Sequence, residues 1–175
     1  IMDTSVGDNP VRDVTAGGGI AYFAFGASTF IGSLTWATSV HASRKQTTYF
    51  ADVVDYFSDP FVGPQIYRGI SSLASVSRAT AQGLITTALT FSTISILAGG
   101  NEYGFTNLED YNAQMYVFKE DSIWTIKNDR ISRINVGLEA FPSSNTGRAV
   151  APQNLFLYFS WSHSLERMHS GTVDD

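Results

Sequence analysis

A candidate acid/base cluster stands between two apolar runs and consists of Lys119, Glu120, Asp121 and Ser122. A lysine beside two carboxyls can transfer protons when burial or a neighbouring charge tunes its pKa. The flanking residues are aromatic or β-branched, as in strands, so the polar stretch is more typical of a hairpin turn. We therefore expect Lys119, Glu120 and Asp121 to be exposed. The apolar residues expected to be buried beside them are Phe118, Ile123, Trp124 and either Leu157 or Phe159.

The stretch WSHSLERM groups a histidine, a glutamate and an arginine, at His163, Glu166 and Arg167. The first two could act as a metal pair or as an acid/base pair. Zinc needs at least three protein ligands, however, and neither an HExxH motif nor a cysteine completes the set. The sequence therefore favours a strand that passes into a turn, where Arg167 pairs with Glu166 or with an acid of a neighbouring strand.

Three aspartates, Asp52, Asp55 and Asp59, suggest a calcium site, because calcium prefers several oxygen ligands. Their spacing lacks the regular Asp-x-Asp-x-Asp-Gly loop, and on a strand Asp52 and Asp55 point to opposite faces. Solvated charges at a sheet edge are the better interpretation, and such charges also deter pairing between edges.

Two further patterns suggest ligands but favour plainer structures. Gly17–Gly19 could hold a phosphate only ahead of a helix, and it precedes the strand-like IAYFAF, so a flexible connection is favoured. Trp36, Trp124 and Trp161 could stack on sugars as in a lectin, yet their strand-like surroundings favour core packing. We therefore expect no catalytic, cofactor-binding or metal-ligating residue, no cofactor and no enzymatic activity.

Composition limits the class of protein. The chain has 175 residues, of which 43% are hydrophobic and 13% aromatic, enough for a folded core, while 15% are charged. Globular proteins average about 25% charged residues, so we expect an uncharged polar surface of the kind that subunit contacts cover. Net charge is −5 and the basic residues are scattered, so nucleic acid is not an expected partner. No cysteine is present, and no run reaches the ~18 apolar residues of a membrane helix.

Strand-like runs between clusters of turn residues predict an all-β, antiparallel fold. The runs cover residues 20–26, 30–37, 47–57, 84–91, 93–100, 114–118, 122–126, 131–138 and 154–161. KNDR, at 127–130, supplies a turn.

A weak internal repeat aligns Gly69–Leu73 with Gly104–Leu108, and a third echo is VGDNPVRDVTA at 6–16. The first two segments are 35 residues apart, and the Val-Gly pairs at 6–7 and 62–63 are 56 residues apart. These spacings bracket the roughly 40 to 50 residues of a four-stranded blade. These echoes favour antiparallel blades of a β-propeller-like fold, with a β-sandwich as the alternative. We expect residues 1–175 to form part of one such domain, truncated at both ends.

Three segments, 105–126, 143–161 and 163–175, together suggest a known family by their residues and by their order in the chain. They resemble a β-propeller-like virion protein of tailed bacteriophages, found in tails or tail tips. The resemblance covers 105–175 well and the first hundred residues loosely. It implies a structural virion component in the tail that assembles with copies of itself and other virion proteins and contacts the host surface. It implies no catalytic residues.

The alternative is a secreted carbohydrate-binding or glycoside-hydrolase-like β-propeller. A glycosidase needs two carboxyl groups about 5 to 10 Å apart, a condition that the sequence leaves open. The Ser-x-Asp-x-Gly-x-Thr-Trp turns of a sialidase-like propeller are absent from the sequence.

Overall fold

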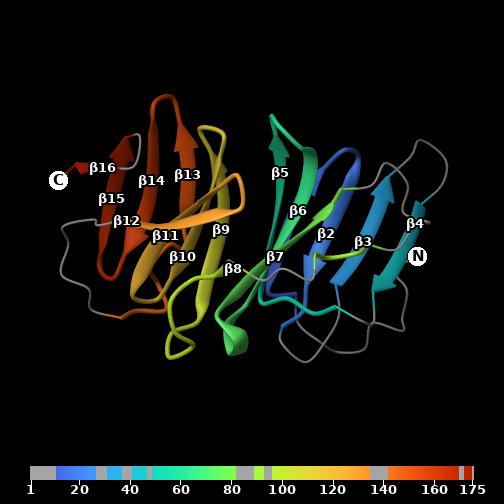
Figure 1. The fold of residues 1–175 in the computed structure, drawn as a ribbon, viewed down its shortest axis with the longest axis horizontal. Helices are drawn as coiled ribbons and strands as arrows, with labels where there is room; N and C mark the ends of the chain where they lie inside the picture. Colours follow the sequence, from blue (N-terminus) through green and yellow to red (C-terminus); the bar gives the residue numbers. More distant parts are fainter. Residues whose placement is uncertain are drawn as a thin grey trace. The chain divides into compact units, whose positions relative to one another are not determined.

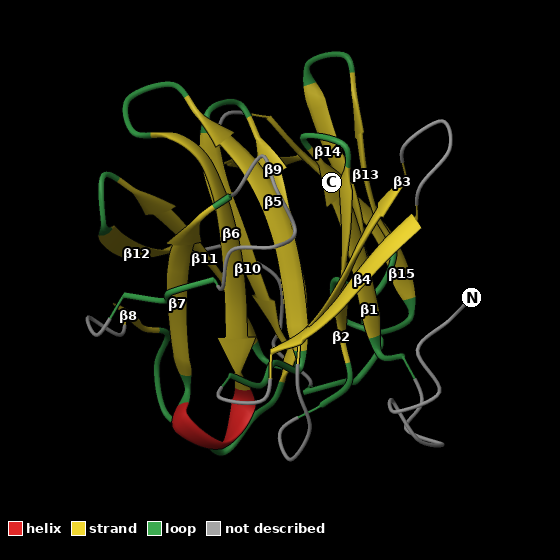
Figure 2. Cartoon of the chain, turned by 90° about the vertical axis from the view of Figure 1, so that its right-hand side faces the viewer, coloured by secondary structure: helices red, strands yellow, loops and turns green. Residues whose placement is uncertain are grey.

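The computed structural model describes residues 11–26, 31–36, 41–46, 49–81, 89–92, 96–134, 142–169 and 172–174. Within these residues the single helical element is the 3₁₀ turn Ser71–Leu73, and strands make up nearly all the regular structure (Figure 2). The all-β, antiparallel class that the strand-like runs predict is therefore confirmed. None of the described residues belongs to a helix with the length and apolarity needed to cross a bilayer.

The described residues form four sheets of four strands each. The strands are β1 (Asp13–Gly17), β2 (Ile20–Ala24), β3 (Ile31–Trp36), β4 (His41–Gln46), β5 (Val53–Asp59), β6 (Gly63–Ile70), β7 (Ser75–Thr80), β8 (Ile96–Leu97), β9 (Phe105–Tyr111), β10 (Gln114–Lys119), β11 (Ser122–Lys127), β12 (Arg130–Ile134), β13 (Val150–Gln153), β14 (Phe156–Trp161), β15 (Ser164–His169) and β16 (Thr172–Asp174). In every sheet the strands follow chain order, from β1 to β4, β5 to β8, β9 to β12 and β13 to β16 (Figure 1).

Short turns with left-handed residues join several of the strands. Gly18 and Gly19 have φ of 60° and 81° between β1 and β2, and Asn128 and Asp129 have φ of 51° and 58° between β11 and β12. Paired positive φ values are typical of the type I′ turn, whose twist matches that of the strands it joins. The glycine run therefore leads into a strand as predicted, but through a tight turn at Gly18–Gly19 and not through the flexible connection that the sequence favours. The turn predicted at KNDR is confirmed.

Polar strands are where the structure departs from the sequence prediction. β4 (HASRKQ), β7 (SVSRAT) and β15 (SLERMH) lack the apolar alternation that marks a strand, and the residues of β15 were expected to form a turn. Each pairs with a strand already held in its sheet, which supplies the missing stabilisation. The predicted strand at 47–57 begins later, at Val53. The predicted run 84–91 lies largely outside the described residues. Of the predicted run 93–100 the structure describes 96–100, where Ile96–Leu97 forms β8.

The internal echo predicted from the sequence is wrong as a structural repeat. Gly69–Leu73 covers the end of β6 and the 3₁₀ turn, whereas Gly104–Leu108 leads into β9, the first strand of its sheet. The two segments therefore occupy different places in their sheets. The repeating unit is the whole four-stranded sheet, and the first strands of successive sheets begin roughly 40 to 50 residues apart.

The chain divides into two compact units, each with its own hydrophobic core. The first unit comprises Ile1–Ile70 and Val76–Ser95, and the second comprises Ser71–Ser75 and Ile96–Asp175. The first thus holds β1 to β6 and most of β7, and the second holds β8 to β16.

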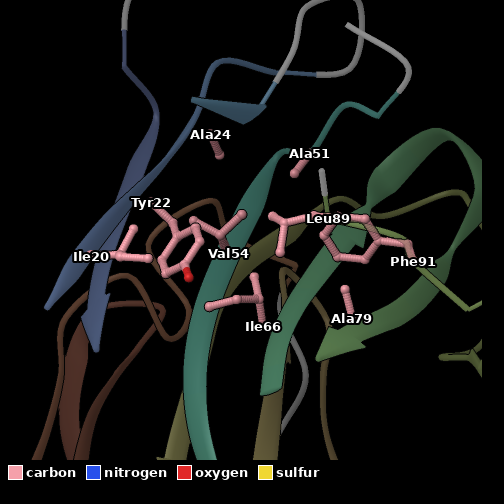
Figure 3. Packing of buried hydrophobic residues seen from close by; sticks show 9 residues of the cluster. All are labelled: Ile20, Tyr22, Ala24, Ala51, Val54, Ile66, Ala79, Leu89 and Phe91. Carbon is pink, nitrogen blue, oxygen red and sulfur yellow. The ribbon is translucent and has the colours of Figure 1, made fainter. Parts of the chain in front are cut away.

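The core of the first unit is formed where the sheet of β1 to β4 meets β5 and β6. Alternate residues of β2 point to this side, and Tyr22 packs with Val54 of β5 and Ile66 of β6 (Figure 3). The other members of the cluster are Ile20, Ala24, Ala51, Ala79, Leu89 and Phe91. Because successive side chains of a strand point to opposite faces, Ile20, Tyr22 and Ala24 share this side, where their burial stabilises the contact.

β1 also binds β5 through its side chains. The Asp13 carboxylate accepts a hydrogen bond from the Val54 amide at 2.9 Å, and the Thr15 hydroxyl accepts one from the Tyr56 amide at 3.0 Å. The Thr15 hydroxyl in turn donates to the Asp55 carboxylate at 2.9 Å. Burial raises the pKa of the Asp13 carboxyl, although hydrogen bonds from backbone amides act in the opposite direction. Polar groups therefore fix β5 against β1 beside the apolar core.

The second unit contains a similar core between β10 and β14. Tyr116 and Phe118 of β10 form one buried cluster with Leu157 and Phe159 of β14, and the rings of Phe118 and Phe159 are 5.6 Å apart. The remaining buried members are Ile123, Trp161 and Met168. As in the first unit, alternate residues of the second strand of a sheet supply the contact.

The segment before β13 closes this second core. The Gly147 amide donates to the Ser160 carbonyl at 2.6 Å, and the Ser143 amide donates to the Glu120 carbonyl at 2.9 Å. Gly147 has a φ of 64°, and a Cβ at this position would overlap the Phe118 side chain. Both the backbone conformation and the close approach to Phe118 therefore require glycine.

Replacing Gly147 by alanine should lower the free energy of unfolding by about 2 to 4 kcal/mol, because alanine disfavours the left-handed backbone conformation at this position and its Cβ clashes with Phe118. Gly63→Ala is the matched control, since Gly63 has a φ of 81° and nothing within 4 Å of an added Cβ. The control should lose only about 1 kcal/mol. Urea unfolding of both variants measures the difference, and equal losses would contradict the predicted clash.

Asp13 gives a pH-dependent prediction. Because its pKa is raised in the folded protein, the stability that it contributes is present below the unfolded value of 3.8 and is lost as the pH rises through the folded value. Asp13→Asn keeps an acceptor for the Val54 amide but cannot ionise. Its stability relative to the parent chain should therefore rise between about pH 3 and about pH 7. Urea unfolding across this range tests the sign, and a relative stability that falls with pH would refute it.

Candidate functional site

The predicted acid/base cluster at 119–122 is a tight hairpin. Lys119 pairs directly with Ser122 across β10 and β11, so the connection is the two-residue turn Glu120–Asp121. The prediction that Lys119 is exposed is wrong, because its exposed fraction is 2%. Glu120 and Asp121 were expected to be exposed, but both are half-buried.

The burial predicted for the apolar neighbours is confirmed for four residues. Phe118, Ile123, Leu157 and Phe159 all have an exposed fraction of 0%. Trp124 is only half-buried, because it directly follows Ile123 and points to the other face of β11.

Lys119 is held by the main chain of a distant segment. Its ammonium group donates hydrogen bonds to the carbonyls of Ala98, at 2.9 Å, and Gly100. Burial lowers the pKa of Lys119, while the carboxylates of Asp121 and two nearby glutamates act to raise it. A buried cation bonded to two carbonyls anchors the segment 98–100 to β10, which is a structural role.

The residues of WSHSLERM do not converge on a site. His163 is exposed in the turn between β14 and β15, whereas Glu166 and Arg167 are neighbours within β15 and so point to opposite faces. The Arg167 guanidinium lies over the Phe156 ring at 4.9 Å. The predicted turn is therefore corrected to a strand in which Arg167 makes a cation–π contact. Asp174 stands opposite Arg167 in β16, where only the backbone is described.

The three aspartates have separate structural roles. Asp52, predicted to be a solvated edge charge, is buried at 8% exposure, and its carboxylate lies 3.6 Å from the Arg12 guanidinium. Asp55 is half-buried beside β1, and Asp59 accepts hydrogen bonds from two amides of the β5–β6 turn. Across the described ranges, no three His, Cys, Asp or Glu side chains are grouped to hold a metal ion.

The three tryptophans differ in their surroundings. Trp161 is 4% exposed and belongs to the core of the second unit, which confirms its predicted core packing. The Trp124 indole donates to the Ser122 hydroxyl at 2.9 Å, and the Arg133 guanidinium lies 5.9 Å from its ring. Trp36 lies in β3, of which only the backbone is described.

A tyrosine recurs in the second strand of every sheet, at Tyr22, Tyr67, Tyr116 and Tyr158. Their spacing of roughly 40 to 50 residues matches that of the sheets. We call the side of a sheet that carries this residue its tyrosine face, and the other side its opposite face. The first three tyrosines are 2%, 2% and 1% exposed, whereas Tyr158 is half-buried. The tyrosine face of the last sheet is therefore the accessible one.

The two cores show how these faces meet. In the first unit the tyrosine face of β2 packs on Val54 and Ile66, which lie on the opposite face of their sheet. In the second unit the tyrosine face of β10 packs on Leu157 and Phe159, on the opposite face of β14. In both units a tyrosine face thus covers the opposite face of the sheet that follows in the chain.

The accessible tyrosine face of the last sheet carries a patch of large side chains. Leu165 pairs with Ser160, two residues after Tyr158, and so shares its face, where it is 71% exposed. Phe156, on the same face, is half-buried beneath Arg167. We call Phe156, Tyr158, Leu165 and Arg167 the Tyr158 patch.

A second accessible patch lies on the opposite face of the first sheet. Val14 is 56% exposed and pairs across β1 and β2 with the half-buried Phe23. Ala16 pairs with Ala21 on the same face. We call Val14, Ala16, Ala21 and Phe23 the Phe23 patch. Sequence reasoning missed both patches, although β14 (FLYFSW) and β2 (IAYFA) are apolar at odd and even positions alike, the signal for burial of both faces.

Comparisons with known proteins inform the fold. No known family matches the chain, and no curated protein matches it. The crystal structure of the computationally designed Ika4 protein is similar, with a TM-score of 0.61 and 8% sequence identity, over 93% of this chain and 92% of that chain. At this identity the likeness concerns the fold alone.

Lys119→Met should lower the free energy of unfolding by about 2 to 4 kcal/mol, because it leaves the carbonyls of Ala98 and Gly100 without their buried donor. Lys127→Met is the matched control, since Lys127 is exposed at the end of β11 and should change stability by less than about 0.5 kcal/mol. Urea unfolding measures both. If the two variants lost the same free energy, the proposed anchoring role of Lys119 would be wrong.

Proposed function

We propose that the four sheets are blades of a β-propeller-like fold. Three observations support this arrangement: each sheet is a four-stranded meander in chain order, each carries the tyrosine in its second strand, and a tyrosine face covers an opposite face in both units. Propellers are built by such radial repetition of four-stranded sheets.

We propose that the protein is a non-enzymatic structural component of a tailed-phage virion, associated with the tail and acting by subunit assembly. The observation that carries this proposal is the pair of accessible apolar surfaces, the Tyr158 patch and the Phe23 patch. Contiguous exposed apolar side chains mark surfaces that bind other molecules. The resemblance of residues 105–175 to a phage tail protein supports the virion as the place where this assembly occurs.

The surroundings of the candidate catalytic residues support a structural role. Lys119 is bonded to main-chain carbonyls, and Asp52 lies beside Arg12. Contact with the host surface is a second role that we propose, supported by Phe61, which is 73% exposed in the β5–β6 turn. Aromatic residues at exposed turns suit contact with a partner.

Mass spectrometry of purified particles tests the proposed function. The source polypeptide should co-purify with intact particles at a fixed copy number, and antibodies against residues 105–134 should label the tail. The purified chain should leave common glycans unhydrolysed. Absence from particles, together with binding of a soluble sugar that Tyr158→Ala abolishes, would overturn the proposal in favour of the secreted carbohydrate-binding alternative.

A further inference from the structure

The Tyr158 patch lacks the cover that its counterparts have. The tyrosines of the other three sheets are at most 2% exposed, and those at β2 and β10 lie in the two cores. Tyr158 occupies the same place in its sheet but is half-buried, and Leu165 beside it is 71% exposed. An additional sheet resting on this face would give Tyr158 the surroundings of Tyr22 and Tyr116.

The Phe23 patch also lacks a covering sheet, but on the opposite face of its sheet and not on the tyrosine face. On the opposite faces of the other second strands, Ile66, Val117 and Phe159 each have an exposed fraction of 0%. Phe23 is half-buried, and Val14 beside it is 56% exposed. The first sheet thus presents an uncovered opposite face, and the last sheet presents an uncovered tyrosine face.

We propose that a second copy of this chain supplies the missing cover, with the Tyr158 patch of one copy packed on the Phe23 patch of the other. This repeats the contact of tyrosine face on opposite face seen in both units. The inference rests on the blade arrangement proposed above. Two copies supply eight sheets, within the range of about four to eight blades of known propellers.

The contact is heterologous, since the two patches differ. Each copy carries both patches, so a closed pair contains two equivalent interfaces, each joining the Tyr158 patch to the Phe23 patch. The aromatic and aliphatic side chains supply apolar area. Arg167 stands opposite Tyr158 and already lies over the Phe156 ring, so its guanidinium keeps this cation–π contact within the patch.

Light scattering after size-exclusion chromatography of the 175-residue chain is the test. The parent chain should have twice its 19.1 kDa monomer mass. Val14→Arg and Leu165→Arg should each give monomers at about 10 μM, a loss of at least about tenfold in affinity, because a buried unpaired charge is costly. Both positions are more than half exposed in the single chain, so folding should persist, as circular dichroism would verify. Leu155→Arg is the matched control, since Leu155 is 66% exposed in the β13–β14 turn, and it should remain dimeric.

Mixing the two monomeric variants distinguishes the geometry. Val14→Arg retains an intact Tyr158 patch and Leu165→Arg retains an intact Phe23 patch, so the mixture should form heterodimers with one native interface, visible by native mass spectrometry. A monomeric parent chain, or a dimer that survives Val14→Arg, would overturn the proposal. Its failure leaves the virion location to be decided by particle composition, so the two ideas fail separately.

Discussion

The packing of a tyrosine face on the opposite face of the following sheet is the contact on which the rest of this structure depends. It requires a second strand that is apolar on both sides, and β10 meets this requirement. Tyr116 and Phe118 on one side, and Met115 and Val117 on the other, are at most 1% exposed. Such a strand is stabilised only when both faces are buried, so each sheet needs covering surfaces that it cannot supply itself.

Buried polar groups stabilise the structure where this apolar packing ends. Asp13 and Thr15 accept hydrogen bonds from amides of β5, and Lys119 donates to carbonyls of the segment that precedes β9. On folding, each group replaces hydrogen bonds to water with hydrogen bonds to the main chain, so its net contribution to stability is modest. Removing it is costly, because a buried partner is then left without a hydrogen bond. These bonds also select one register, because a shift by one residue would leave the partners unsatisfied.

The strands rich in apolar and aromatic residues could be predicted from the sequence, whereas the polar strands that depend on pairing with their neighbours could not. β2, β10, β11 and β14 follow local pattern, whereas β15 (SLERMH) depends on pairing with β14. Lys119 was misplaced because its acceptors lie about 20 residues earlier in the chain, and no local pattern reveals such a partner. The tyrosine repeat is present in the sequence, but its unequal spacing and differing neighbours conceal it until the strands are aligned by sheet.

The central claim is that three tyrosine faces are covered within one chain and that the face of Tyr158 is covered only by a second copy. Residue-level hydroxyl-radical footprinting of the four tyrosines tests this claim most directly. In the proposed dimer of the parent chain, Tyr22, Tyr67, Tyr116 and Tyr158 should all be protected. In monomeric Leu165→Arg only Tyr158 should become reactive, because the other three are already at most 2% exposed within one chain. Equal reactivity of Tyr158 in both forms, or reactivity of the other three in the folded monomer, would contradict the packing described here.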